Sequence, residues 1–503
     1  MTRLGLDLGS TAAQASFVTP QGVPTLVPDA RLSSEFRTPS AVHLEGEVAL
    51  VGHAAEAALL DTPGIAVARH FKSALGSGRA LLTDDSGRSW SSEGLTALLI
   101  RKLLLDLEAA ESESAESVTI AVPAGFSESQ RQATRMAAQM AGVSNVALVD
   151  EPVAAAYFHG LGRGHGEQTV VVYDFGGGSV DASVLNVSAG RLSVLAADGE
   201  PELGGGKVDA VVADLIAREF RRAHGTDPMG DPVGREQLLR AAEELKLALL
   251  VSGRGHVRKT LLLMGRALDF ALTRDQFNLV TDPLVDESIA ACQRCLHAAG
   301  LGWNAVDRIF LTGGAAQMPS VLRKLALASG RGAEELQLRQ PFSATAYGAA
   351  LAAESGVHEA QHMALNSVAP CHLGLRVRDP VTGRANFEPL IKRNTPLPAT
   401  HTATFYTTRP EQTRIILDIV QSKDGVEVVD SLGYFAFGPI RRPQKNYPVE
   451  VTVSYNAEGM ARVQARDPIS GETLERTMLD TSDPAAARLA QERAWLGGVS
   501  ITH

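Results

Sequence analysis

The sequence predicts an α/β domain over residues 1–355 and an all-β domain over residues 370–480, and three observations support this prediction. Up to about residue 355, short β-branched runs alternate with segments of helical apolar spacing, which is the pattern of a sheet covered by helices. After residue 370 the helical period disappears, and short alternating runs follow that are punctuated by Pro, Gly, Asp and Asn. In addition, two segments of the α/β region resemble each other, which indicates an internal repeat.

The strands and helices of the α/β region follow one another in a regular order. Ser127 and Gln130 have the spacing of a capping box at the start of a helix, which Gly142 would end. Apolar residues at helical spacing predict further helices over 151–160, 208–220, 235–250 and 284–300. Runs of β-branched residues predict strands over 118–123, 145–150, 170–175 and 308–314.

The all-β region consists of short runs in which apolar and polar residues alternate. Strands are predicted over 372–377, 389–398, 402–408, 414–421, 434–438, 449–456 and 461–467. Residues 356–369 carry little periodicity and are predicted to be a linker between the two domains. Residues 481–503 are expected to form one short helix or tail and nothing larger.

The composition is that of an ordinary globular protein of about three domains, at roughly 150 residues for each. Of the 503 residues, 45% are hydrophobic and 21% are charged, which excludes a disordered or collagen-like chain. With 47 basic and 57 acidic residues the net charge is −10, so no surface for nucleic acid is expected. The sequence shows neither a signal peptide nor 18 successive apolar residues, so we expect a cytoplasmic protein without a membrane partner.

Three cysteines are too few to cross-link a chain of this size, and they indicate a reducing compartment. Cys292 and Cys295 have CxxC spacing, but they lie in the helical pattern of 284–300, and no second pair of ligands is near in the sequence. We therefore expect both residues to be packing positions rather than a zinc or redox site.

The internal repeat aligns LDLGSTAAQASFV at 6–18 with YDFGGGSVDASVL at 173–185 without a gap. Asp7 falls on Asp174, and Gly9 falls on Gly176. Each copy is an apolar run, an Asp-x-Gly turn with small residues, and a second alternating run. This pattern predicts two β-hairpins with tight glycine turns, and we expect them to face each other.

A glycine turn beside an aspartate has a defined chemical use. Small side chains let backbone N–H groups approach a polyphosphate, and the aspartate can hold a hydrated Mg²⁺ ion. Either turn alone is equally compatible with a simple tight turn, but their similarity favours a clamp around one nucleotide. Gly313 and Gly314 form a further turn after a predicted strand, and the sequence contains no GxxxxGK[ST] loop.

Five segments in order resemble the motifs of the actin-like ATPases: two phosphate motifs, two connecting helices and the adenosine motif. The first phosphate motif is LGLDLGSTAAQASFV, and the first connecting helix is VDEPVAAAYFHG. The second phosphate motif is VVVYDFGGGSVDASVL, the adenosine motif is RIFLTGGAAQMPSVL, and the second connecting helix is PFSATAYGAALAA. The resemblance is closest to the heat-shock protein 70 (DnaK-like chaperone) family and continues into the all-β region. It implies an actin-like two-lobed ATPase domain that closes on Mg²⁺ with ATP or ADP. A β-sandwich for extended or unfolded polypeptides would follow, without the family's helical lid, as in a truncated member.

The resemblance also assigns catalytic roles to individual residues. Asp7 and Asp174 match the carboxylates that hold Mg²⁺ through water. Lys72 matches the lysine at the γ-phosphate, and Glu151 matches the glutamate near the attacking water. Ser179 and Asp181 complete the expected catalytic set. The expected nucleotide-binding residues are Gly9, Ser10, Thr11, Gly176, Gly177, Gly178, Gly205, Gly206, Glu243, Lys246, Gly313 and Gly314.

Two further sets of residues match positions of the family outside the nucleotide site. Pro123 and Arg131 match the pair that relays the nucleotide state towards the linker. The positions that line the peptide groove fall on Leu375, Phe405, Ile415 and Leu417. An apolar slot with free strand backbone could bind an extended peptide, whereas alternating apolar strand residues are usually core. The sequence is compatible with both roles, a peptide groove and a core position.

The sequence departs from the family at the base and at the co-chaperone site. Gln317 replaces an arginine that stacks on the base, and Leu250 replaces an adenine-contacting serine, so we expect weaker nucleotide binding. Ala147 stands where an arginine contacts the J-domain co-chaperone. A J-domain protein and a nucleotide exchange factor are the partners that the resemblance implies, and we expect the J-domain to stimulate hydrolysis only weakly.

The sequence therefore predicts an ATP-dependent chaperone of the heat-shock protein 70 type with slow ATP turnover. One alternative is a non-catalytic, nucleotide-dependent scaffold for a dedicated partner, although Asp7, Lys72, Glu151 and Asp174 are all present. A second alternative is an actin-like small-molecule kinase, which shares the phosphate loops. The all-β region argues against a kinase.

Overall fold

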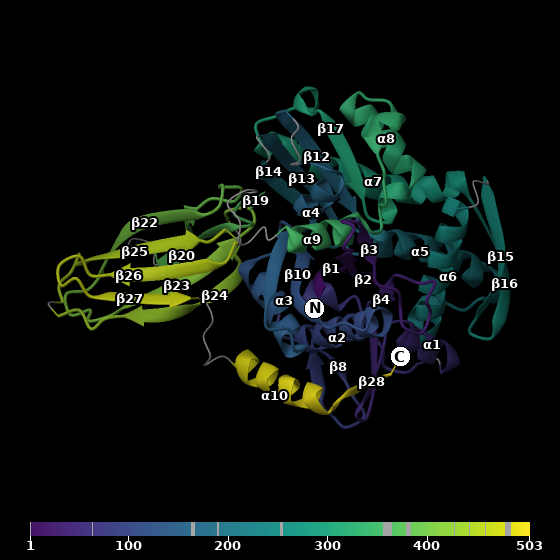
Figure 1. Ribbon diagram of the computed structural model, residues 1–503, viewed down its shortest axis with the longest axis horizontal. Coiled ribbons are helices and arrows are strands. Elements are labelled where there is room, and N and C mark those ends of the chain that lie inside the picture. The colour runs from purple at the N-terminus through teal and green to yellow at the C-terminus, as the bar shows by residue number, and fades with distance from the viewer. Residues whose placement is uncertain are drawn as a thin grey trace.

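The computed structural model contains two large mixed sheets with their helices, followed by a sandwich of two smaller sheets (Figure 1). The described residues are 2–62, 64–161, 166–188, 191–251, 255–355, 365–378, 384–426, 428–441, 443–457, 459–477 and 484–502. None of the helices within these ranges is both long enough and apolar enough to cross a bilayer.

The first large sheet has the strand order β11-β10-β1-β2-β3, with β4 paired to β2. Strand β1 pairs in parallel with β10 and antiparallel with β2. The strands are β1 (Thr2–Leu8), β2 (Ala12–Val18), β3 (Pro24–Leu26), β4 (Thr38–Pro39), β10 (Ala115–Val122) and β11 (Val146–Asp150). Smaller strands lie beside this sheet: β5 (Ala41–Glu45), β6 (Val48–Val51), β7 (Ala68–Arg69), β8 (Ala80–Thr83) and β9 (Ser89–Ser91).

The second large sheet repeats this topology with the order β18-β17-β12-β13-β14-β19. Strand β12 pairs in parallel with β17 and antiparallel with β13, as β1 does with its neighbours. The strands are β12 (Gln168–Phe175), β13 (Val180–Ser188), β14 (Arg191–Glu200), β17 (Arg308–Thr312), β18 (Leu336–Gln337) and β19 (Leu365–Asn366). The repeat found in the sequence is thus also a repeat of topology. A separate hairpin is formed by β15 (His256–Leu263) and β16 (Arg266–Thr273).

The helices cover these sheets. They are α1 (His53–Asp61), α2 (Ser92–Glu111), α3 (Glu128–Met140), α4 (Glu151–Phe158), α5 (Gly205–His224), α6 (Pro232–Val251), α7 (Arg274–Ala298), α8 (Pro319–Ser329), α9 (Ala344–Glu354) and α10 (Pro484–Gly498). The helices predicted over 151–160, 208–220, 235–250 and 284–300 are confirmed, whereas those over 53–61 and 92–111 were not predicted. The predicted capping box of Ser127 and Gln130 begins α3. Cys292 and Cys295 of α7 are buried in the core beneath the second sheet, as packing positions would be.

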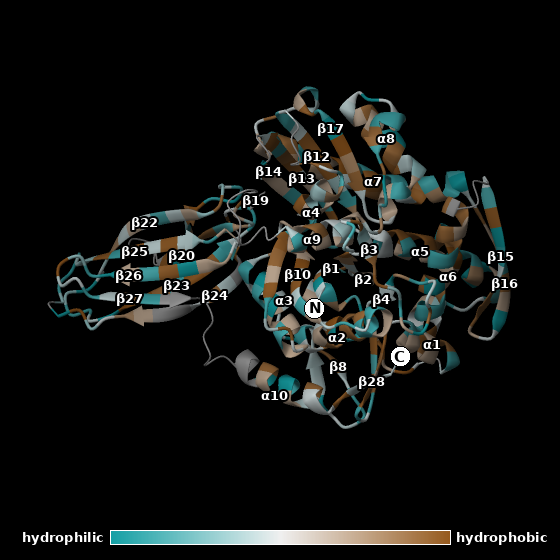
Figure 2. Ribbon diagram, in the orientation of Figure 1, coloured by the Kyte–Doolittle hydropathy of each residue, from teal (hydrophilic) through white to brown (hydrophobic). Residues whose placement is uncertain are grey.

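Helices α4 and α9 pack against each other between the two large sheets. A Cβ atom added to Gly348 of α9 would lie 1.8 Å from the backbone oxygen of Ala154 in α4. Only glycine permits this approach. The strands of both sheets are largely apolar, as the brown β10 and β17 of Figure 2 show.

The C-terminal sandwich consists of the sheets β21-β20-β23-β24 and β22-β25-β26-β27. Its strands are β20 (His372–Arg378), β21 (Ala385–Ile391), β22 (Ala399–Tyr406), β23 (Ile415–Ser422), β24 (Val428–Phe437), β25 (Pro448–Tyr455), β26 (Ala461–Arg466) and β27 (Thr473–Thr477). Alternate residues of both sheets fill a separate core, which is the arrangement of a β-sandwich.

The structure differs from the sequence prediction at the linker and at the C-terminus. Most of the predicted linker, residues 356–364, lies outside the described residues, but Leu365 and Asn366 form β19 and pair with β14. The C-terminal segment forms α10 and then a strand, β28 (Ser500–Thr502), which pairs in parallel with β6. The expected short helix is therefore confirmed, whereas the strand that follows it was not expected. A strand of three residues is too short to show an alternating pattern.

Candidate functional site

The two predicted hairpins bring their aspartates to the ends of β1 and β12. Asp7 lies opposite Gln14 in the β1–β2 pair. Asp174 lies opposite Asp181 in the β12–β13 pair. Because the two sheets share one topology, the two aspartates take equivalent places, each just before a glycine turn.

The glycine turns of the two hairpins touch each other. A Cβ atom added to Gly177 would lie 1.9 Å from Oγ1 of Thr11, and one added to Gly178 would lie 2.4 Å from Oγ of Ser10. Real Cβ atoms do not come this close to another heavy atom, so only glycine lets the turns approach. The expected phosphate-binding residues of both turns therefore lie at one site.

Further backbone contacts fix the turns in place. The N–H groups of Gly205 and Gly206, in the first turn of α5, donate to the carbonyl oxygens of Gly176 and Gly177, both at 2.9 Å. On the opposite side, Oγ of Ser40 donates to the carbonyl oxygen of Gly9 at 2.7 Å. These hydrogen bonds to their carbonyl oxygens fix both glycine turns, and the small residues at the tips of the turns face one another.

A cluster of acidic side chains surrounds one lysine beside these turns. Lys72 lies in a short 3₁₀ helix, η1 (Phe71–Ala74), and its Nζ donates to Oε1 of Glu151 at 2.8 Å. Glu151 is the first residue of α4, where the helix dipole favours a negative charge. Ser179 Oγ donates to Oδ2 of Asp181 at 2.8 Å. The expected catalytic residues are therefore brought together.

Burial and mutual repulsion perturb the acids of this cluster. Burial, together with the charge of Glu151, raises the pKa of Asp7 to about 7 and that of Asp181 to about 6. The same two causes raise the pKa of Asp174. Burial acts to lower the pKa of Lys72, but Glu151 and Asp7 outweigh it and raise that pKa. Such perturbed acids are typical of functional sites, and an added cation would favour their ionised forms.

The expected nucleoside-binding residues lie next to the phosphate turns. Gly313 follows β17, and a Cβ atom added there would lie 2.5 Å from Oδ1 of Asp174. A Cβ atom added to Gly314 would lie 2.7 Å from the ring of Phe342. On α6, Glu243 lies one turn before Lys246, whose Nζ contacts the backbone oxygen of Gly205 at 3.5 Å.

A family model described as Hsp70 protein matches residues 3–491, which is nearly all of the 503 residues. The chain belongs to the Hsp70 family. Members of the Hsp70 family are ATPases and chaperones that bind ATP or ADP with Mg²⁺.

The expected Hsp70 relay pair lies at the junction with the β-sandwich. Arg131 of α3 is buried, and its Nη2 donates to Oδ1 of Asp150 at 2.8 Å. Asp150 in turn accepts a hydrogen bond from Ser367, directly after β19. Pro123 directly follows the preceding strand and begins the turn that leads to α3. Arg131 is therefore linked through Asp150 to the end of the linker, and the relay role of the pair stays a prediction.

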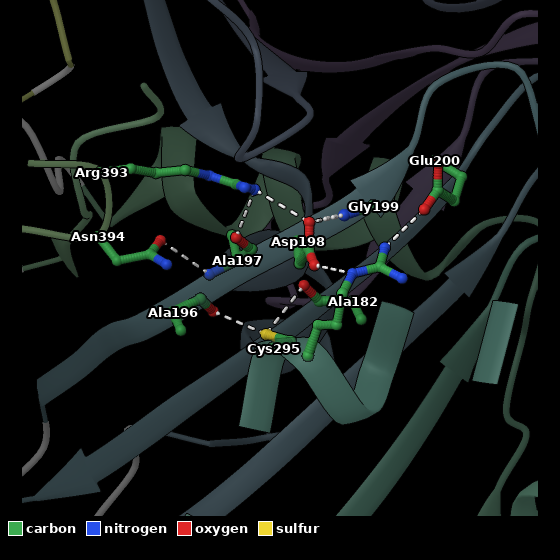
Figure 3. Close-up of polar contacts among 10 residues, drawn as sticks. Ala182, Ala196, Ala197, Asp198, Gly199, Glu200, Cys295, Arg393 and Asn394 are labelled. Atoms are coloured by element: carbon green, nitrogen blue, oxygen red, sulfur yellow. Dashed lines mark hydrogen bonds and ion pairs between the residues drawn. The ribbon is translucent and has the colours of Figure 1, made fainter. Parts of the chain in front are cut away.

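A loop of the sandwich also contacts the second sheet, as Figure 3 shows. Arg393 donates to the carbonyl oxygen of Ala197 at 2.8 Å and to Asp198 at 3.2 Å. Asn394 Oδ1 accepts from the Ala197 N–H at 3.2 Å. Arg294 of α7 approaches the other oxygen of Asp198 at 2.8 Å. The sandwich is thus in contact with both large sheets.

The four expected peptide-binding residues lie within the sandwich. Leu375, Ile415 and Leu417 are only 2%, 8% and 3% exposed and belong to its core, and Phe405 packs against that core while remaining partly exposed. In this conformation the first three take the core positions that alternating strand residues usually take. Their contact with a peptide stays a prediction.

Several contacts within the α/β region could not be expected from the sequence. Lys246 forms an ion pair with Asp209 of α5 at 2.8 Å, and burial raises the pKa of Asp209 to about 6. Arg69 of β7 links Glu56 of α1 with Glu236 of α6. A cavity of about 480 Å³ beside this link is lined by α1 and α6, and none of the expected phosphate residues line it. These pairs join residues far apart in the chain, and no local pattern marks them.

Proposed function

We propose that this Hsp70 chain hydrolyses ATP in the cleft between its two large sheets and couples hydrolysis to the binding of extended polypeptide. The two sheets with their helices would be two lobes that close on Mg²⁺ and ATP. The observation that carries this proposal is the close contact between the glycine turns. A Cβ atom placed on Gly177 would lie only 1.9 Å from Oγ1 of Thr11. Two such turns offer backbone N–H groups to one triphosphate from both sides.

The acid cluster fits a divalent cation. Three carboxylates, Asp7, Glu151 and Asp181, interact with Lys72, and Asp174 lies among these acids. Asp7 and Asp174 lie near the ends of equivalent strands. Within the described residues no three candidate ligands are grouped to hold an ion directly, so Asp7 and Asp174 would hold hydrated Mg²⁺ through its water ligands. The ion would neutralise charge on the transferred phosphoryl group.

The protein side chains would supply positioning and charge. The ammonium of Lys72 would stabilise the negative charge that develops on the γ-phosphate oxygens. Glu151, which holds Lys72 at 2.8 Å, would also accept a hydrogen bond from the attacking water and orient it. Ser10 and Thr11 would donate to the phosphates. No covalent intermediate on the protein is required.

Replacing Lys72 by Ala tests this proposal. We expect the rate of phosphate release at saturating ATP to fall about 100-fold or more, because a preorganised charge is lost, while ATP affinity measured by calorimetry changes only a few-fold. Lys324→Ala is the matched control, since Lys324 pairs with Asp286 on the far helices α7 and α8. Unchanged phosphate release in Lys72→Ala would overturn the proposed role, and a wild-type chain without turnover would favour a non-catalytic scaffold.

A further inference from the structure

The C-terminal segment 484–502 is built into the domain that carries Lys72. Strand β28 extends the small sheet of β5, β6 and β7, with Ser500 opposite Val48 and Thr502 opposite Leu50. Helix α10 packs on α2, and Figure 1 shows it running back from the sandwich to this part of the molecule. Leu496 and Val499 belong to the same buried core as the strands of the first sheet.

Glu492 of α10 completes the N-terminus of α2. Its side chain is fully buried, and its Oε1 accepts from the backbone N–H of Ser91 at 3.0 Å while its Oε2 accepts from Oγ of Ser91 at 2.6 Å. Ser91 is the N-cap of α2 and accepts from the N–H of Gly94. A Cβ atom on Gly94 would lie 2.4 Å from Oε2 of Glu492, so glycine leaves the room that this carboxylate needs.

The first turn of α2 holds the loop that contains Lys72. Ser92 Oγ donates to the carbonyl oxygen of Phe71, the first residue of η1. Oε1 of Glu93 accepts from the N–H of Gly76 at 3.0 Å, just after η1. The contacts run without a gap from Glu492 through Ser91, Ser92 and Glu93 to both ends of η1.

Helix α10 also touches this loop directly. The guanidinium of Arg488 donates to the carbonyl oxygen of Gly78, six residues after Lys72. Gly76 is enclosed from the other side, because a Cβ atom there would lie 2.8 Å from the backbone of Ser129 in α3. The loop 71–78 is therefore held by α2, α3 and the C-terminal helix together.

We propose that the C-terminal segment 484–502 positions Lys72, with Glu492 and Arg488 as its positioning residues. This inference rests on the proposed ATPase function and adds a regulatory route to it. Strand β27 ends at Thr477, and α10 begins at Pro484. Seven Cα-to-Cα steps span at most roughly 25 Å, so a large displacement of the sandwich pulls on α10 and thereby on the lysine loop.

The test replaces Glu492 by Gln, which keeps the shape and removes the negative charge. The amide oxygen can still accept from the Ser91 N–H, but the amide N–H₂ group must donate to Oγ of Ser91, which then loses its carboxylate acceptor. Arg493→Gln is the matched control, because Arg493 is the next residue of α10 and is exposed. We expect Glu492→Gln to lower the rate of phosphate release about tenfold or more through misplacement of Lys72, with ATP affinity changed less than threefold. The control keeps the wild-type rate. Equal rates in both variants would overturn the inference.

A second readout does not depend on turnover. In the nucleotide-free protein, hydrogen exchange of residues 71–78 should become about tenfold faster in Glu492→Gln, since the contacts that hold the Gly76 amide are loosened. Unchanged exchange would contradict the inference even if the wild-type chain proved inactive, which separates this test from that of the ATPase proposal. If Glu492→Gln does not fold, Arg488→Ala repeats both measurements, because Arg488 is only half-buried and contacts the loop itself.

Discussion

At the residue scale, the candidate site holds more negative charge than one lysine can balance. Asp7, Glu151 and Asp181 interact with Lys72, and Asp174 interacts with these three acids. Burial and the charge of Glu151 raise the pKa of Asp7 to about 7, so a proton competes for this carboxylate near neutral pH in the ligand-free protein. A divalent cation that needs both carboxylates ionised must displace that proton.

Binding of Mg²⁺ with ATP should therefore depend on pH. Below pH 7 Asp7 is protonated, and each rise in pH removes the competing proton, so we expect the dissociation constant to fall by up to about tenfold per pH unit between pH 6 and 7 and to level off above. Calorimetry from pH 6 to 8 measures this. Asp7→Asn is the control, because it lacks the titration of Asp7 while Asp174, Asp181 and the nucleotide still titrate. The same slope in wild type and in Asp7→Asn would refute this explanation.

The sequence indicates these residues unequally. Asp7 and Asp174 stand out through the repeat, since each lies in the same Asp-x-Gly turn. No local pattern marks Lys72, because a single lysine is usually solvated. Its role at the γ-phosphate was expected only from the resemblance to the family. Glu492 was missed, since a glutamate in a short helix is expected to face water. Its burial depends on Ser91, which lies 401 residues away.

At the scale of elements, α3 forms the contact between the first sheet and the sandwich. The backbone N–H of Glu128 donates to Oε1 of Gln421 in β23 at 3.2 Å. The carboxylate accepts from Gln132 at 3.0 Å and from the backbone of Ala461 in β26 of the sandwich. It also faces Arg131 and Arg135 on its own helix. Burial outweighs these groups and raises the pKa of Glu128 to about 7.

Docking of the sandwich on α3 should loosen as the pH rises. The docked form holds a proton on Glu128, and an undocked, solvated Glu128 releases it at its ordinary pKa of roughly 4.3. Docking is therefore fully favoured below that value and weakens as the pH passes from about 4 through 7. Energy transfer between dyes on cysteines placed at Glu108 and Glu472, both exposed, should therefore fall between about pH 4 and pH 7. The three native cysteines are buried.

Glu128→Gln supplies the control for this measurement. Its amide cannot ionise, so energy transfer should stay high and constant over the same pH range. An identical loss of transfer in Glu128→Gln and in the wild type would show that another group controls docking.

Local signals explain which elements were predictable. The capping box of α3, the glycine turns of the hairpins and the alternation of the sandwich strands all lie within short stretches of chain. Strand β28 and the β19–β14 pair carry no such signal. Each has only two or three residues and pairs with a partner far away in the sequence.

At the scale of the whole molecule, the sandwich is attached to both large sheets. Ser367 and Gln421 reach residues of the first sheet and α3, whereas Arg393 and Asn394 reach β14 of the second sheet. A change in the angle between the sheets therefore alters contacts at the sandwich. The sequence predicted the order of the domains but not these contacts, because loops and linkers do not encode their partners locally.

The central claim, that the opposed glycine turns hold one nucleotide, is tested most directly by calorimetric titration of Mg²⁺ with ATP into wild type and Gly177→Val. A side chain at Gly177 must displace Thr11, so we predict binding of one nucleotide to the wild type and at least tenfold weaker binding to the variant. Gly166→Val, at an exposed position with open space around it, should bind as the wild type does. Equal affinity in Gly177→Val, or no binding to the wild type, would contradict the account.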